Sequence, residues 1–307
     1  MTKGFFSRGF LGKRREVAEA GRLPPGQYLT EDFPVLSAGP TPYTPKDKWD
    51  FTVVGAVEMP QRWNWDEFHT LPRETVTVDI HCVTKWSKFD TRWSGVSLDT
   101  ILGAAKPQAA YMLAFCDGGY FTNLPLADVT NNKTWIVDSY DGAPLPPEHG
   151  GPVRLLVPGR YGMKSAKWVV ALQPTLDNAF GFWELRGWTD TAVVKTMARI
   201  DSPAPGARVS PGPLRLAGVA YAGRRGIAGV EVSADGGRSW QPARLLDDAA
   251  TPLTWRRWEA EVTLGSAARA TLTVRAQDGE GYAQVAEPAR PIPGGASGLH
   301  TIAVLTA

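Results

Sequence analysis

Short apolar runs with the spacing of β-strands alternate with weaker helical segments between residues 49 and 200. Four runs are rich in β-branched residues or alternate apolar and polar positions, namely FTVVGAV, TVTVDIHCV, VRLLVPG and WVVAL. Two others, WNWDEFHTL and LDTILGAA, place apolar residues at helical spacing instead. This mixture predicts an α+β fold for residues 49–200.

The pattern changes after a segment rich in proline and glycine at residues 201–213. DSPAPGARVSPGP holds four prolines and two glycines, which predicts a linker. Over residues 214–307 the runs LRLAGVAY, GVEVSAD, WRRWEAEV and ATLTVRAQD recur, with turn residues such as Asp235-Gly236-Gly237 between them. This spacing predicts an all-β immunoglobulin-like sandwich. Residues 1–48 hold too many prolines for a helix, so we expect an extended N-terminal arm there.

Charge and composition exclude several partners for the chain. The 307 residues include 33 basic and 31 acidic side chains, which argues against nucleic acid or an anionic membrane as a partner of the whole chain. Glu16 and Glu19 follow the basic N-terminal residues where a signal peptide would be apolar. No stretch approaches the ~18 apolar residues of a membrane span. We therefore expect a cytoplasmic protein.

The chain has two cysteines, Cys82 and Cys116, too few for a disulfide framework or a closed zinc or iron–sulfur site. Alternation in TVTVDIHCV places Cys82 on the apolar face of a strand, where a buried structural cysteine is the commoner outcome. A catalytic pair with His81 has little support, since neighbours in a strand face opposite sides. Basic residues follow Cys82 and could lower its thiol pKa or attract an anion, unless they belong to a solvated loop; they are Lys85, Lys88 and Arg92.

A second candidate region combines basic residues with glycines. In HGGPVRLLVPGRYGMKSAKWVVALQ four basic side chains appear with no acidic one, at Arg154, Arg160, Lys164 and Lys167. Glycines allow backbone N–H groups to approach a phosphate, and Arg or Lys supplies charge-assisted hydrogen bonds. A hairpin with lysines turned to solvent is an alternative. The motifs GxGxxG, Walker A, HExxH, GxSxG and CxxCH do not occur, so the sequence indicates no nucleotide or haem site.

Together these segments resemble the oxidoreductase molybdopterin-binding domain of the sulfite oxidase superfamily. The resemblance covers roughly residues 30–190 and is carried by HCVTKWS, FTNLPLADV and LPPEHGGPVRLLVPGRYGMKSAKW. It implies a molybdenum-molybdopterin cofactor with Cys82 as the metal ligand. Cys82, Lys85 and Arg92 are then the candidate catalytic residues, with the two cations drawing in an anion such as sulfite. The cofactor contacts that the resemblance implies are Ser37, Gly39, Thr41, Asp117, His149, Arg154, Ser165, Ala166 and Lys167. It assigns no ligand role to Cys116.

Two branches of this superfamily are represented in different parts of the chain. The cysteine motif and YGMKSAKW are similar to the catalytic subunit of protein-methionine-sulfoxide reductase, whereas the segment from GVAYAGRRG to WRRW resembles the dimerisation domain of sulfite oxidases and nitrate reductases. The resemblance therefore implies two-electron oxygen-atom transfer on a small sulfur or nitrogen oxyanion, most simply sulfite, with sulfoxide or nitrate reduction as alternatives. It also makes a homodimer plausible. Because no haem, flavin or iron–sulfur motif occurs in the sequence, we expect a separate redox partner, a cytochrome or a quinone-linked protein. A binding protein that merely retains the fold is the non-enzymatic alternative.

Overall fold

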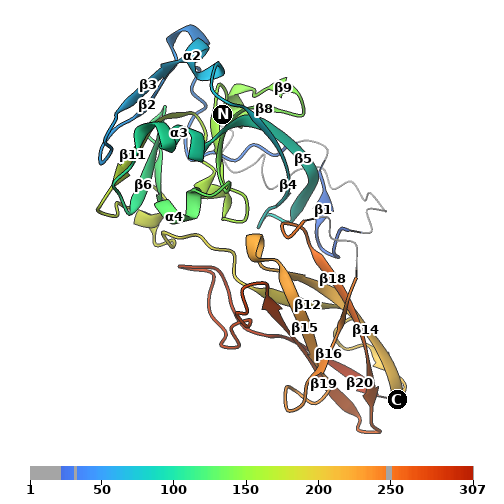
Figure 1. Ribbon diagram of the computed structural model, residues 1–307. Coiled ribbons are helices and arrows are strands. Elements are labelled where there is room, and N and C mark those ends of the chain that lie inside the picture. Colours follow the sequence, from blue (N-terminus) through green and yellow to red (C-terminus); the bar gives the residue numbers. More distant parts are fainter. Residues whose placement is uncertain (1–21, 31–32, 247–250, 307) are drawn as a thin grey trace, which may run out of the picture. The chain divides into compact units, whose positions relative to one another are not determined.

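The computed structural model describes residues 22–30, 33–246 and 251–306 (Figure 1). The chain divides into two compact units. Thr30–Thr84 and Lys88–Ala192 form the first unit, and Lys85–Ser87 and Val193–Ala307 belong to the second, together with the described part of Arg14–Leu29. The basic N-terminal residues that bear on the localisation prediction lie outside the described residues.

Two sheets form the first unit. In one sheet β5 (Trp86–Ser97) pairs with β4 and β8, and β8 also pairs with β9 and β10. The short strand β1 is parallel to the first two residues of β5, and those paired residues belong to the second unit. The other sheet has the order β3-β2-β11-β6-β7. The bounds are β1 (Tyr28–Leu29), β2 (Asp50–Val53), β3 (Gln61–Asn64), β4 (Glu74–His81), β6 (Tyr111–Cys116), β7 (Phe121–Pro125), β8 (Trp135–Tyr140), β9 (Ala143–Pro144), β10 (Arg154–Leu156) and β11 (Val169–Thr175).

The helices of the first unit are short and begin at residues that cap them. Helix α2 (Trp65–His69) starts with a capping box of Asn64 and Glu67, and the Ser97 hydroxyl accepts from the backbone N–H of Thr100 at the start of α3 (Leu98–Ala105). The remaining helical turns are α4 (Leu126–Val129), η1 (Lys46–Lys48), η2 (Pro147–His149), η3 (Gly162–Lys164) and η4 (Glu184–Arg186). Mixed sheets with few helices confirm the α+β prediction.

One apolar core holds the two sheets and α3 together. Phe51 from β2, Ile101 from α3 and Leu155 from β10 are fully buried members of it. Gly95 of β5 permits close pairing with β8, because a Cβ there would lie 2.1 Å from the carbonyl oxygen of Ile136. The core therefore fixes the sheet that contains β4, β5, β8 and β10. Most of the candidate site lies on these strands and on the loops next to them.

The second unit is made of two sheets with the orders β12-β14-β18-β17 and β13-β20-β19-β15-β16. Their inner faces share one core that includes Leu216, Val232, Trp258 and Val274. The bounds are β12 (Met197–Ser202), β13 (Arg208–Val209), β14 (Gly212–Tyr221), η5 (Gly223–Arg225), β15 (Ile227–Ser233), β16 (Gln241–Pro242), β17 (Arg244–Leu245), β18 (Arg256–Leu264), β19 (Arg269–Asp278) and β20 (His300–Thr306).

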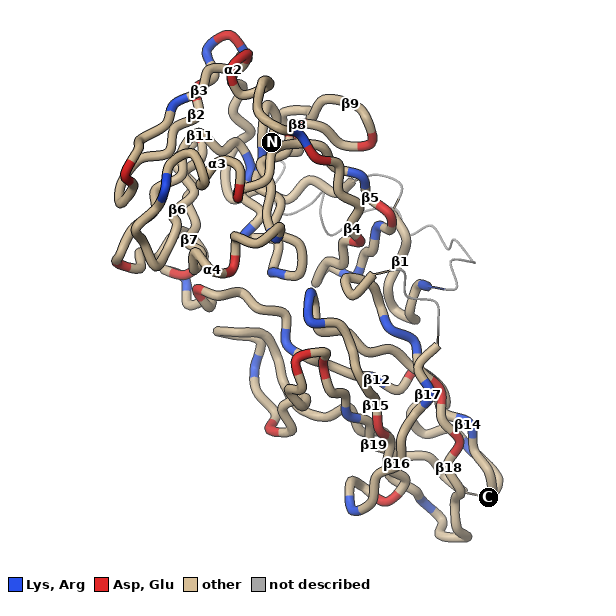
Figure 2. Tube along the Cα trace, viewed as in Figure 1, with Lys and Arg blue, Asp and Glu red and all other residues tan. Residues whose placement is uncertain are grey.

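Basic and acidic residues are interspersed along the strands of this second unit (Figure 2). Arg215 of β14, for example, lies directly opposite Glu261 of β18. Basic and acidic side chains are therefore close to one another on the strands of the second unit, as well as nearly equal in number over the whole sequence.

Two sequence expectations differ from what the structure shows. Asp79, assigned to the polar face of its strand, is buried at 7% exposure, because its carboxylate accepts a hydrogen bond from the backbone N–H of Asp90 at 2.8 Å. Residues 201–213, expected as a linker, instead contribute to β12, β13 and β14 of the second unit, because their prolines and glycines form turns between strands. The two units meet in sequence at Ala192 and Val193, ahead of that segment.

The described part of the predicted arm contains only β1 and η1 as regular elements. No helix among the described residues is long and apolar enough to cross a membrane.

Candidate functional site

Arg154 lies at the centre of the group of predicted residues that the fold brings together. It begins β10, and its guanidinium donates to the carbonyl oxygens of His149 at 3.1 Å and Ser165 at 3.0 Å. Burial lowers its pKa to about 10. Because β10 forms a bridge from Arg154 to Lys167, the two cations are held on neighbouring segments.

Lys167 connects this segment to the N-terminal arm. Its ammonium group donates to the hydroxyl of Ser37 and, at 2.9 Å, to the carbonyl oxygen of Glu148. The pKa of Lys167 is lowered to about 7, mainly by burial and next by the charge of Arg154. The Glu148 carboxylate raises this pKa, but by less than Arg154 lowers it. A lysine with this pKa is only partly protonated near neutral pH, and an anion beside it would favour its charged form.

Ser165 and Ala166 hold the segment against β10 through their backbone and hydroxyl groups. The Ser165 hydroxyl accepts from the backbone N–H of Val157 at 3.0 Å, and the Ala166 carbonyl accepts from the N–H of Leu155 at 2.8 Å. Gly150 fits beside them with a φ of +105°, where a Cβ would lie 3.0 Å from the side chains of both Arg154 and Lys167.

His149 is the last residue of η2 and packs in an aromatic cluster. Phe33 contacts the rings of His149, Trp93 and Tyr140, at centroid distances of 5.3, 5.8 and 5.6 Å. Burial, followed by the charge of Arg154, lowers the pKa of His149. The guanidinium of Arg154 lies over the Trp93 ring at 5.5 Å. This cluster was not among the sequence predictions, because its members come from four separate segments and match no motif.

Cys82 directly follows β4 and is half-buried, with its neighbour Val83 at 95% exposure. The Thr84 hydroxyl donates to the Cys82 sulfur at 3.1 Å. The sulfur therefore lies beside a polar hydrogen-bond donor at a strand end. Cys116, by contrast, is buried, and burial raises its thiol pKa to about 12. Of the two cysteines, Cys82 is the one in a position to bind a metal.

The three cations that follow Cys82 in sequence do not share one environment. Lys85 is exposed with a φ of +72°, in the turn before β5. Lys88 lies over the Tyr140 ring at 5.9 Å, so it borders the aromatic cluster. Arg92 is exposed in the middle of β5. Its backbone N–H donates to the Asp141 carboxylate at 3.2 Å, and its carbonyl oxygen accepts from the backbone N–H of Asp141 at 2.8 Å. The Thr91 hydroxyl donates to the carbonyl oxygen of Val78, which lies four residues before Cys82, or roughly 13 Å along the strand at ~3.3 Å per residue. Arg92 follows Thr91 and lies farther still from Cys82.

The remaining predicted contacts fall into two groups. The backbone N–H of Asp117 donates to the carbonyl oxygen of Trp168 at 2.8 Å, next to Lys167, and its carboxylate accepts from Thr44 at 2.5 Å. Gly39 is half-buried and Thr41 is exposed. Thr44 was missed by sequence reasoning, although it lies in the same proline-rich segment as Ser37.

The residues present fit a molybdenum-pterin cofactor. Among the described residues no cluster of three or more His, Cys, Asp or Glu side chains could hold a metal ion, so a metal at Cys82 needs further ligands from a bound cofactor. The Nε of Arg154 is buried without a hydrogen-bond partner, beside an ammonium group that also favours an anion. A phosphate would satisfy both, which is the chemistry that the cofactor's terminal group supplies.

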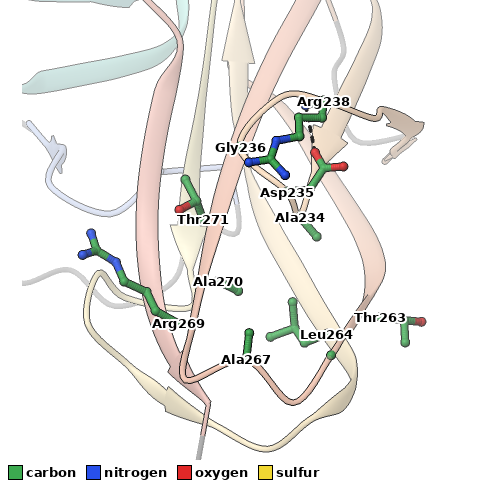
Figure 3. A pocket seen from close by; sticks show the side chains of 11 residues that line it. Ala234, Asp235, Gly236, Arg238, Thr263, Leu264, Ala267, Arg269, Ala270 and Thr271 are labelled. Carbon is green, nitrogen blue, oxygen red and sulfur yellow. Dashed lines mark hydrogen bonds between the residues drawn. The ribbon is translucent and has the colours of Figure 1, made fainter.

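A hollow of about 440 Å³ lies in the second unit (Figure 3). Arg238, Arg269 and Thr271 are among its lining residues, and the Asp235 carboxylate accepts from the backbone N–H of Arg238 at 2.9 Å. None of the predicted site residues lines it.

A half-exposed cysteine sulfur and a cradle of two cations on the same sheet framework, in a mixed α+β unit, fit the class of cofactor-dependent metal oxidoreductases. Family models then match most of the chain: the oxidoreductase molybdopterin binding domain over residues 38–183 and the Mo-co oxidoreductase dimerisation domain over residues 189–303. The chain belongs to the molybdopterin-dependent oxidoreductases of the sulfite oxidase superfamily. It is an enzyme of this family and uses a molybdenum-molybdopterin cofactor.

Individual relatives agree with this family. The uncharacterized oxidoreductase YuiH of Bacillus subtilis is 40% identical over 58% of this chain and 92% of its own length. Human mitochondrial sulfite oxidase is 28% identical over 77% of this chain, which spans 54% of that enzyme. The crystal structure of the sulfane dehydrogenase SoxCD from Paracoccus pantotrophus superposes with a TM-score of 0.58 at 25% identity, covering 85% of this chain and 76% of that one. The chain thus spans about half the length of the sulfite oxidase that it matches.

Proposed function

We propose that this chain oxidises sulfite to sulfate and passes two electrons to a separate redox protein. Sulfite and water give sulfate, two protons and two electrons, so atoms and charge balance once an external acceptor takes the electrons. The observation that carries the proposal is the Arg154–Lys167 cradle on the same sheet framework as the half-exposed Cys82 sulfur. The similarity of the chain to human sulfite oxidase and to the sulfane dehydrogenase SoxCD supports a sulfur substrate.

The chain's own residues would hold and orient the cofactor. Cys82 would be the protein ligand of the metal, with the Thr84 hydroxyl donating to its sulfur and drawing electron density from it. Arg154 and Lys167 would bind the phosphate, and Ser37 would keep the Lys167 ammonium directed towards it. When bound, the cofactor supplies a two-electron redox couple and a transferable oxygen.

Positive charge near the sulfur would attract the anionic substrate. Lys88 is the cation that the fold places beside the aromatic cluster around His149, whereas Lys85 and Arg92 lie in the turn and on the exposed part of β5. We assign all three to anion attraction, with Lys88 contributing most, because charge acts more strongly where water is partly excluded.

The second unit would pair two copies of the chain. Its two sheets enclose one core and it matches the family's dimerisation domain, which together support an immunoglobulin-like sandwich that forms a homodimer. Light scattering of the purified chain should give twice the mass of one chain, and a monomeric mass across the micromolar range would contradict this part of the proposal.

The substrate is tested by a kinetic comparison on one preparation. Protein made in a host that synthesises the cofactor is assayed for sulfite oxidation with ferricyanide and for methionine-sulfoxide and nitrate reduction with a reduced viologen dye. We expect sulfite to give the highest kcat/KM, and Cys82→Ser to abolish it. Cys116→Ser is the matched control, since that thiol is buried in the apolar core of the first unit and has no assigned ligand role, and it should keep the activity.

A higher kcat/KM for the sulfoxide or for nitrate would overturn the proposed substrate and establish one of the reductase alternatives. Activity that survives Cys82→Ser with an unchanged molybdenum content would overturn the assignment of the metal ligand.

A further inference from the structure

A fully buried ion pair lies under the segment that carries Ser165 and Lys167. The Lys164 side chain has 0% exposure and its partner Glu184 has 1%. Lys164 Nζ donates to the Glu184 carboxylate at 2.5 Å, and to the Asn123 carbonyl and side-chain oxygens at 2.7 and 2.8 Å. All three N–H groups of the ammonium are therefore used within the protein.

These contacts join three parts of the first unit that are far apart in sequence. Lys164 ends η3, Asn123 lies in β7, and Glu184 begins η4. The network continues from Asn123 to Asn178, whose amide donates to the Asp190 carboxylate at 2.9 Å. Lys164 is followed at once by Ser165, so the position of Lys164 sets where the cofactor-contacting segment starts.

A second tie holds the same turn from the other side. The Tyr120 hydroxyl donates to the carbonyl oxygen of Met163 at 2.7 Å, one residue before Lys164. Two polar anchors on consecutive residues restrict both the position and the rotation of the turn more than one would.

Stability alone does not explain the pair. Burial costs both charged groups their hydration, and it lowers the pKa of Lys164 in spite of the adjacent carboxylate. The second oxygen of Glu184 is also buried with no hydrogen-bond partner. Apolar residues of similar size often stabilise a fold as well as such a pair does, so directional bonding is what a lysine and a glutamate add here.

We propose that Lys164 and Glu184 are positioning residues that hold the Ser165–Lys167 segment in the geometry needed to retain the molybdenum cofactor. Neither side chain is accessible to a substrate, so they act through the residues that follow Lys164. The inference rests on the cofactor assignment and deepens the proposed function, but it does not depend on which substrate the enzyme oxidises.

The test compares cofactor retention in variants of the full chain. Lys164→Met/Glu184→Gln removes both charges with little change in volume, and molybdopterin per chain is followed over time by the fluorescence of its oxidation product. We expect cofactor release to be roughly tenfold to a hundredfold faster than in the wild type, as for other residues that orient a metal site indirectly. The melting temperature of the cofactor-free double variant should stay within a few degrees of the wild type.

A matched pair in the second unit serves as the control. Arg225 and Asp278 form another ion pair, at 2.7 Å, in which the carboxylate is fully buried and the arginine side chain is 16% exposed. Arg225→Met/Asp278→Asn should release the cofactor at the wild-type rate, even if it lowers the melting temperature. Should Lys164→Met/Glu184→Gln not fold, Glu184→Gln alone decides, because Lys164 keeps its bonds to Asn123 in that variant.

Wild-type release rates in the double or single variant would overturn the inference, and so would equal acceleration in the control pair. Faster release in the variant combined with a wild type that does not oxidise sulfite would instead overturn the proposed function and leave the positioning role standing.

Discussion

Lys167 should make the stability of the cofactor-free protein depend on pH in a defined window. Its pKa is about 7 in the folded chain against 10.5 for an ordinary lysine, with burial as the main cause. Between these two values the unfolded chain holds a proton that the folded chain lacks, so the free energy of unfolding rises with pH. Below about pH 7 both states are protonated, and the slope from this group disappears.

The size of the effect follows from the width of that window. Each unit of pKa shift corresponds to about 1.4 kcal/mol, which gives an upper limit of roughly 5 kcal/mol for full burial. Lys167 is only partly buried, and solvent around it screens the charge, so we expect roughly 2 kcal/mol between pH 7 and 10.

The assay is urea unfolding of the cofactor-free protein, wild type against Lys167→Met, at several values between pH 6 and 10. Other groups titrate in both proteins and cancel in the difference. The wild type should gain about 2 kcal/mol on the variant as the pH rises through this range. Lys48→Met, a change of an exposed lysine in the same unit, controls for the loss of one surface charge. A difference that stays flat from pH 7 to 10, or that falls, would refute the reasoning.

Three further outcomes are expected from other positions. Arg154→Lys keeps a charge but cannot make both hydrogen bonds, to His149 and Ser165, so cofactor content of the purified protein should fall at least tenfold; full content would contradict the cradle. Gly95→Ala forces a Cβ to 2.1 Å from a backbone oxygen and should destabilise the first unit by about 3 kcal/mol or more in chemical unfolding, whereas a loss under about 1 kcal/mol would show that β5 and β8 can move apart. Ser97→Ala removes the N-cap of α3 and should lower unfolding free energy by about 1 kcal/mol, with Ser94→Ala as the control on the same strand.

Local pattern was sufficient to predict many of the elements of this fold. The runs assigned to strands became β2, β4, β10 and β11 in the first unit and β14, β15, β18 and β19 in the second, because their side chains have the period of a half-buried sheet. Asp79 was predicted on the polar face of its strand, but it is buried, because its carboxylate accepts a hydrogen bond from the backbone N–H of Asp90 in the neighbouring strand. The sequence of one strand does not show such a partner.

The residues of the candidate site also fall into two groups, those that local sequence indicates and those that only tertiary packing brings together. Arg154, Ser165 and Lys167 lie in one contiguous segment, so the resemblance of that segment brought them together without knowledge of the fold. Thr44 and the aromatic residues around His149 come together only through tertiary packing, and no short-range spacing indicates them. The buried charge of Lys164 was assigned to a phosphate cradle from sequence, yet the structure turns it inward to Glu184, because a lysine's direction depends on which carboxylate folds against it.

The contrast between the two thiols gives the protein an internal reporter. Cys116 is buried and stays protonated, whereas the sulfur of Cys82 is half-exposed at the end of its strand. An alkylating reagent applied to folded protein should therefore modify a single site, and a bound metal should shield that site. The number of modified thiols per molecule, read by intact mass, would then count empty active sites in any preparation without measuring turnover.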